Sequence, residues 1–203
     1  MALLSGTFTF KKFKIIDELP GNFKETLVQN LPRHSFREIS PQTNPELSIG
    51  WVNAFQPIDT RLTLEKALFG KYILLGLRRD KKNVAAALLR AQVSEAVRAQ
   101  LRERRGKKLS REDVNTLRDT VREKMLAAVS PSTNFYEMVW NYETQEVYFS
   151  AQGGKAVDEF VELFEETFKL ALEETNLASR TERYIEEKGL SLELIDIEPA
   201  RFV

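Results

Sequence analysis

Lys and Arg side chains between residues 78 and 122 are the groups in this sequence best suited to a chemical task, which is binding phosphate. The stretch RERRGKKLSRED, residues 102–113, holds six of them around one glycine. At 100° per residue, Arg111, Arg118 and Arg122 lie within about 40° of one another on a helix, and three more arginines gather likewise on the helix before it. Such stripes neutralise the phosphates of nucleic acids. The candidate DNA-binding residues are Arg78, Arg79, Lys81, Lys82, Arg98, Arg102, Arg105, Lys107, Lys108, Arg111, Arg118 and Arg122.

The arrangement of these charges carries a cost that an ordinary solvated helix avoids. Arg98 with Arg102, and Arg118 with Arg122, are like-charge neighbours four residues apart, and each pair destabilises a helix by about 0.2–0.5 kcal/mol. Three acidic residues of the second helix instead gather on a different face. This separation favours a surface that meets a polyanion, whereas a surface that serves solubility or a protein contact stays the alternative.

The formal net charge of zero conceals a strong separation of charge along the chain. Residues 71–131 hold 16 Lys and Arg against 7 Asp and Glu, a net charge of +9. Residues 132–203 hold 6 against 16, a net charge of −10, and the first 70 residues carry +1. A polyanionic partner is one explanation. The other is that the basic part docks on the acidic part, within one chain or between two chains.

Two long helices must position the cationic stripes, and their turn is the glycine-containing stretch. The first is predicted over about 83–105, ended by Gly106 in a left-handed conformation. The second is predicted over about 110–129, where Ser110 and Asp113 resemble a capping box. Narrow apolar seams predict that the two helices pack on each other. The first helix would be about 35 Å long, so we expect the pair to protrude as an arm.

The rest of the sequence predicts an α+β fold, an antiparallel sheet backed by helices with a protruding two-helix hairpin arm. Residues 1–80 and 132–203 are expected to form an α+β body together, and residues 81–131 the basic helical hairpin. The strand over 71–79 has a nearly continuous apolar run and is expected to lie centrally. The other expected elements are strands near 7–16, 49–55 and 190–197, a β-hairpin over 135–150 turning at 141–145, and helices over 21–31, 154–175 and 179–188.

Catalysis has weaker support in this sequence. The chain has no cysteine, and its one histidine, His34, lies in a proline-bounded segment where a surface role is the simpler interpretation. The GGK at 153–155 lacks the full phosphate-loop pattern. Acidic pairs such as Asp158 with Glu162 could hold a divalent metal for a nuclease, but they also fit a solvated helix face. We therefore predict no enzyme activity, no cofactor and no metal.

The apolar runs are too short to span a bilayer, and the first residues lack the basic region that opens a signal peptide. The expectation is a cytoplasmic protein without a membrane partner.

The order of several motifs resembles the RdgC family of recombination-associated proteins. These are GWV at 50–52, ILLGLRRDKKNV at 73–84, RRGKKLSREDVNTLRDTVREKML at 104–126 and FYEMVWNYETQEVYFSA at 135–151. The likeness covers roughly residues 1–175, and the chain is shorter at its C-terminus. Family members bind DNA with little sequence preference and form dimers around a basic hole. The resemblance implies a ring-like or clamp-like homodimer that holds duplex DNA through its phosphates, associates with the nucleoid and modulates recombination.

Two functions stay open at this point. The first is a non-catalytic, sequence-independent DNA-binding protein. The second is a protein–protein interaction module whose basic helical arm docks on an acidic surface of a partner subunit. A metal-dependent nuclease comes third.

Overall fold

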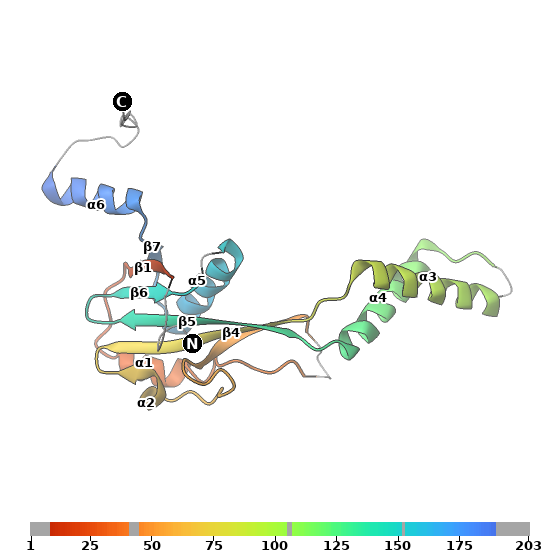
Figure 1. Ribbon diagram of the computed structural model, residues 1–203, viewed down its shortest axis with the longest axis horizontal. Helices are drawn as coiled ribbons and strands as arrows, with labels where there is room; N and C mark the ends of the chain where they lie inside the picture. The colour runs from red at the N-terminus through yellow and green to blue at the C-terminus, as the bar shows by residue number, and fades with distance from the viewer. Residues whose placement is uncertain (1–8, 41–44, 105–106, 152, 190–203) are drawn as a thin grey trace, which may run out of the picture. The chain divides into compact units, whose positions relative to one another are not determined.

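The structure, a computed structural model, describes residues 9–40, 45–104, 107–151 and 153–189. Its helices and strands follow one another in mixed order along the chain (Figure 1). They are β1 (Lys11–Ile15), α1 (Phe23–Asn30), β2 (Leu47–Asn53), α2 (Leu64–Ala67), β3 (Leu68–Phe69), β4 (Tyr72–Lys81), α3 (Ala86–Glu103), α4 (Arg111–Ala128), β5 (Ser132–Asn141), β6 (Glu146–Phe149), α5 (Gly154–Phe168), β7 (Leu172–Glu174) and α6 (Leu177–Lys188).

One antiparallel sheet contains the strands, in the order β2-β4-β5-β6-β1-β7, with β3 paired to β4. The β5–β6 hairpin brings Trp140 opposite Val147 and turns through residues 142–145. β4 lies between β2 and β5, as its apolar run indicated. The predicted α+β class with an antiparallel sheet is confirmed.

The chain divides into two compact units, which we describe separately. The first comprises residues 1–35, 51–77 and 136–203, and the second comprises 36–50 and 78–135. The second unit therefore contains the expected hairpin, and also the segment before β2 and the adjoining ends of β4 and β5. Protrusion of the hairpin stays a prediction.

The core of the first unit is built where α5 covers the sheet. Phe160 of α5 stacks on Phe149 of β6, with ring centroids 3.9 Å apart, and packs against Phe13 of β1 at 5.4 Å. Burial recurs at every second strand residue, as the pleat requires. The buried apolar strand residues that follow this spacing are Phe13, Ile15, Ile73, Leu75, Leu77, Met138, Trp140, Val147 and Phe149.

A buried polar contact ties α5 to β2. The indole Nε1 of Trp51 donates to Thr167 Oγ1 at 2.8 Å, and that hydroxyl donates to the carbonyl of Leu163 at 2.6 Å. Both Trp51 and Thr167 are fully buried. Each polar atom of the pair is thereby satisfied, as burial demands.

The predicted helix over 154–175 is wrong beyond residue 168. Lys169 adopts a left-handed conformation with φ of 57° and ends α5. Leu172–Glu174 then form β7, which pairs antiparallel with β1, and the Lys11 ammonium lies 2.7 Å from the Glu174 carboxylate. Glu173, which falls within the helix predicted over 154–175, is therefore a strand residue.

Several element bounds differ from expectation. β1 begins at Lys11, so residues 9 and 10 of the predicted strand are not part of it, and residues 7 and 8 lie outside the described residues. α6 begins at Leu177 rather than residue 179. The short elements α2 and β3 were not predicted. The expected strand over 190–197 and Gly106 lie outside the described residues.

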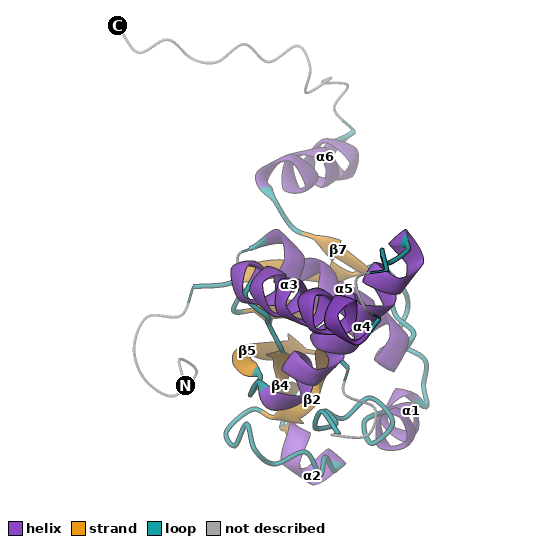
Figure 2. Cartoon of the chain, turned by 90° about the vertical axis from the view of Figure 1, so that its right-hand side faces the viewer, coloured by secondary structure: helices purple, strands orange, loops and turns teal. Residues whose placement is uncertain are grey.

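The second unit contains the helical hairpin. α3 and α4 lie side by side (Figures 1 and 2). Their seam is thin, since no residue of α3 is buried and α4 has two buried residues, Met125 and Leu126. The capping box is confirmed: Ser110 Oγ accepts from the Asp113 N–H at 3.1 Å, and an Asp113 carboxylate oxygen accepts from the Ser110 N–H at 3.0 Å.

We expect Thr167→Val to lower the free energy of unfolding by about 1–3 kcal/mol, because it leaves the buried Trp51 N–H without an acceptor. Urea unfolding followed by far-UV circular dichroism measures the loss. Thr120→Val is the matched control, because that exposed hydroxyl also bonds a carbonyl four residues back but serves no buried donor. Equal losses in the two variants would contradict the assignment.

Candidate nucleic-acid interface

The turn of the hairpin is held by polar contacts that join the end of α3 to the start of α4. Arg104, the C-cap of α3, places Nη1 3.1 Å from Oδ2 of Asp113. Asp113 thus serves the cap of its own helix and also binds the preceding helix. Hydrogen bonds from Ser110, and then the one from Arg104, hold the pKa of the Asp113 carboxyl below its ordinary value of 3.8.

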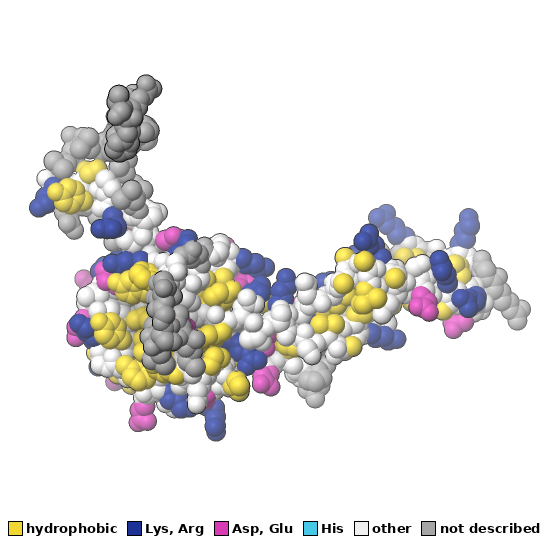
Figure 3. Space-filling view, in the orientation of Figure 1, with side chains coloured by type: hydrophobic (Ala, Val, Ile, Leu, Met, Phe, Trp, Pro, Cys, Tyr) yellow, Lys and Arg dark blue, Asp and Glu magenta, His cyan; other side chains and the backbone are white. Residues whose placement is uncertain are grey.

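Six of the predicted DNA-binding residues are exposed and have no side-chain ion pair or hydrogen bond among the described residues. On the face drawn in Figure 3, Lys and Arg side chains stand out along the two helices. Unpaired cations at a surface can neutralise phosphates and so release the counterions that condense on a nucleic acid. The six are Arg98, Arg102, Lys107, Lys108, Arg111 and Arg118.

Two other predicted residues have structural partners instead. Arg78 binds Asp80 through two contacts of 3.0 and 2.8 Å, and its guanidinium carbon lies 4.3 Å from the centroid of the Phe36 ring. The hydrogen bond to Asp80 raises the pKa of Arg78. Lys82 is buried, and its ammonium donates to the carbonyl of Leu126 at 2.8 Å. Phosphate binding by either residue stays a prediction that this geometry does not favour.

The remaining four predicted residues differ in their surroundings. Arg79 and Lys81 are half-buried on the last residues of β4, and Arg79 has an interaction partner. Arg122 is half-exposed and places Nη2 2.7 Å from Oε1 of Glu46. Arg105 lies outside the described residues.

A groove of about 450 Å³ lies at the base of the hairpin, within the second unit. Arg118 and Arg122 enter it from α4, whereas Glu46 enters it from the segment before β2. The main chain of Glu46 is held in place, because its carbonyl accepts from the Lys82 N–H at 2.8 Å. The lining residues are Glu46, Lys82, Asn83, Val84, Ala86, Leu89, Asn115, Arg118, Asp119, Arg122 and Leu126.

Glu46 and Arg104 were not among the residues predicted for this surface. Glu46 lies far from Arg122 in the chain, so no helical spacing joins them. Arg104 and Asp113 lie on opposite sides of the turn, where a helical wheel does not apply. The Ser110 and Asp113 spacing was the one local signal, and it located the cap correctly.

Among the described residues, the groups considered for catalysis do not come together in one site. His34 is half-buried, and its carbonyl accepts from the Trp51 N–H at 2.9 Å. Gly153 is the N-cap of α5, and Lys155 lies 4.0 Å from Glu159. Within the described ranges, no group of three or more His, Asp or Glu side chains could hold a metal ion. No helix in the described part of the chain is long and apolar enough to cross a membrane.

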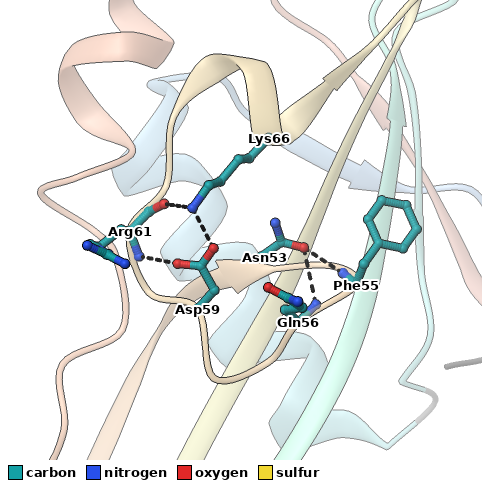
Figure 4. Close-up of polar contacts among 6 residues, drawn as sticks. All are labelled: Asn53, Phe55, Gln56, Asp59, Arg61 and Lys66. Atoms are coloured by element: carbon teal, nitrogen blue, oxygen red, sulfur yellow. Dashed lines mark hydrogen bonds and ion pairs between the residues drawn. The ribbon is translucent and has the colours of Figure 1, made fainter.

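A second hollow, of about 590 Å³, lies along residues 55–61 in the first unit. The side chains of Asn53 and Asp59 cap main-chain N–H groups there, and Lys66 bonds both Asp59 and the Arg61 carbonyl (Figure 4). The hydrogen bond from Lys66 lowers the pKa of Asp59. These contacts fix the loop and leave Ile58 exposed. The polar groups in these contacts serve the loop itself, so we assign the hollow no chemistry.

The chain matches a protein-family model whose description is "Putative exonuclease, RdgC". The match runs from residue 9 to residue 185, which includes both helices of the hairpin. A comparison with curated proteins found no match.

The Asp113 carboxyl is expected to titrate below pH 3.8 in the folded protein, and Arg104→Ala is expected to raise its midpoint. Because the folded pKa is lowered, the cap stabilises the hairpin above the unfolded pKa and loses this effect as pH falls through the folded pKa. Carboxyl-carbon chemical shifts in an NMR titration measure both midpoints. A wild-type midpoint at or above 3.8 would show that the cap does not bind the charged form.

Proposed function

The chain belongs to the RdgC family, and with that membership as the premise we propose that it is a non-catalytic protein that binds duplex DNA without sequence preference. The family connects the chain with recombination. The proposal extends this connection to a mechanism, in which the helical hairpin binds the DNA backbone. The family's description also names an exonuclease. We do not propose that activity for this chain.

The six exposed cations without partners on the hairpin carry this proposal. Internal ion pairs would have to be broken before a cation could bind phosphate, and these side chains have none among the described residues. Contacts from Lys and Arg to phosphate fix a protein on the duplex but read no sequence. The expected binding is therefore strong at low salt and indifferent to base sequence.

The net charge of the second unit supports the same function. Its segments, 36–50 and 78–135, hold 16 Lys and Arg against 9 Asp and Glu, a net charge of +7. A field of this sign increases the rate of encounter with a polyanion even when the whole chain is neutral. We infer that the hairpin is the part that meets DNA first.

The proposal includes a homodimer, which is the assembly that the family likeness implies. Two hairpins that hold one duplex would double the number of neutralised phosphates. Such a clamp would cover DNA that a recombinase needs, and this is how we connect binding with modulation of recombination.

The acidic face of α5 favours a second candidate function. Asp158, Glu162, Glu165 and Glu166 are exposed on that helix. A basic hairpin could dock on this face of a second copy, and the chain would then be an interaction module. The charges that DNA would neutralise are the same ones that such an interface would use.

The variant Arg98→Ala/Arg102→Ala/Arg111→Ala is expected to weaken duplex binding about tenfold or more at low salt. The logarithm of the affinity falls with the logarithm of the salt concentration, and each lost phosphate contact makes this slope shallower by about 0.9. The variant's slope should therefore be shallower by about 2–3. Fluorescence anisotropy between about 50 mM and 200 mM salt measures both quantities.

The matched control is Arg33→Ala/Arg61→Ala/Lys155→Ala, which removes three exposed cations from the first unit. It should keep the wild-type slope. An affinity that is flat with salt, or equal slopes in the two variants, would overturn the proposal. Shortening of an end-labelled duplex by the wild type in Mg²⁺ would show that the protein is a nuclease.

Sedimentation with and without a short duplex separates the two candidate functions. DNA binding predicts that protein and duplex sediment together at low salt and part as salt rises, while the protein's own association state stays unchanged. Docking on α5 predicts that salt dissociates the protein and that DNA has no effect. Under docking alone, Glu162→Gln/Glu166→Gln should also weaken self-association.

A further inference from the structure

The groove at the base of the hairpin brings together two arginines in different electrostatic states. Arg118 and Arg122 are one helical turn apart on α4, and both line the groove. Arg122 is bound to Glu46 at 2.7 Å. Arg118 has no side-chain partner among the described residues. One cation is therefore available at once, and the other is held by a carboxylate.

The contact between Arg122 and Glu46 is of a kind that a stronger anion can replace. The side chain of Arg122 is 50% exposed and that of Glu46 is 43% exposed. Ion pairs this accessible to water contribute little to stability. A phosphate oxygen can occupy the place of the carboxylate oxygen, because guanidinium groups bind both groups in the same planar manner.

Glu46 can leave the groove without any movement of its main chain. Its carbonyl accepts from the Lys82 N–H at 2.8 Å, which fixes the backbone beside the last residue of β4. Only the side chain needs to rotate. The chain therefore carries a tethered carboxylate that occupies an anion position when no other anion is present.

Neutral donors and the other charged groups complete the groove. The side-chain amides of Asn83 and Asn115 are exposed and line it, and an amide donates readily to a phosphate oxygen. The Lys82 ammonium is buried in the wall, where it donates to the Leu126 carbonyl. Asp119 is the acidic group besides Glu46 that lines the groove. Three cations therefore face two anions there, and one anion is displaceable.

We propose that this groove seats one phosphate of the DNA backbone. Arg118 and the two amides bind the phosphate first, and Arg122 then exchanges Glu46 for it. Glu46 thereby competes with DNA and lowers the affinity of the hairpin. This inference rests on the proposed DNA binding, and it identifies one position and one competing residue within it.

The deciding experiment compares Glu46→Gln with Glu112→Gln in the anisotropy assay. Both substitutions remove one negative charge from the second unit, but Glu112 is exposed on a different face of α4 and does not line the groove. Glu46→Gln should raise duplex affinity at low salt on the order of threefold to tenfold and steepen the salt slope by about 1. Glu112→Gln should leave the slope unchanged and raise affinity less.

A double-mutant cycle tests the exchange of Arg122. Arg122→Ala in the Glu46→Gln background should abolish the gain in affinity, because the released guanidinium is then absent. Arg118→Ala should weaken binding in both backgrounds. Circular dichroism and the unfolding midpoint show whether each variant is folded as the wild type is, and the Gln variants keep the size of the native side chain.

Equal effects of Glu46→Gln and Glu112→Gln would overturn the proposal that the groove seats a phosphate. The proposed function would survive that result if Arg98→Ala/Arg102→Ala/Arg111→Ala still lost affinity, and both would fail if it did not. The last arm uses inorganic phosphate followed by ³¹P NMR. Phosphate binding that needs Arg118, together with DNA affinity that does not, would assign the groove to a free anion and contradict the seat for DNA.

Discussion

The cations of α3 and α4 repel one another, and the rest of the second unit must offset this repulsion for the two helices to stay folded. Arginines one turn apart destabilise each helix, and two helices of this length gain little from propensity alone. The seam between them buries few side chains completely. The hairpin compensates with polar contacts at its two ends. The Ser110 cap and Arg104 hold the turn, and Lys82 holds the last turn of α4 through the Leu126 carbonyl.

The two units therefore obtain their order from different interactions. The first has an aromatic core in which Phe160 lies among Phe13, Trp51, Phe149 and Phe164. Rings of this size bury much apolar surface each. The second has charges at its surface and hydrogen bonds at its ends. A unit with few buried apolar groups can keep many exposed cations, because its structure does not require them to be paired.

Local patterns predicted much of this fold, and contacts between distant segments account for what they missed. The alternation around Trp140, the helical spacing in α3 and α4, and the Ser110 cap each act within a few residues, so the sequence displays them. The end of α5 was missed because pairing with β1 withdraws residues 172–174 from a pattern that still reads as helical. The cationic stripe was visible as a spacing on a helix. The partners of Arg78 and Lys82, and the pairing of Glu46 with Arg122, depend on tertiary structure that no spacing reveals.

Both tryptophans of the chain, Trp51 and Trp140, are in the first unit. Tryptophan fluorescence consequently does not report the unfolding of the helical hairpin. The far-ultraviolet circular dichroism signal includes α3 and α4. If the two probes give different transition curves, the hairpin unravels independently of the aromatic core. The positions of the two tryptophans thus allow the cooperativity of unfolding between the two units to be measured without an added label.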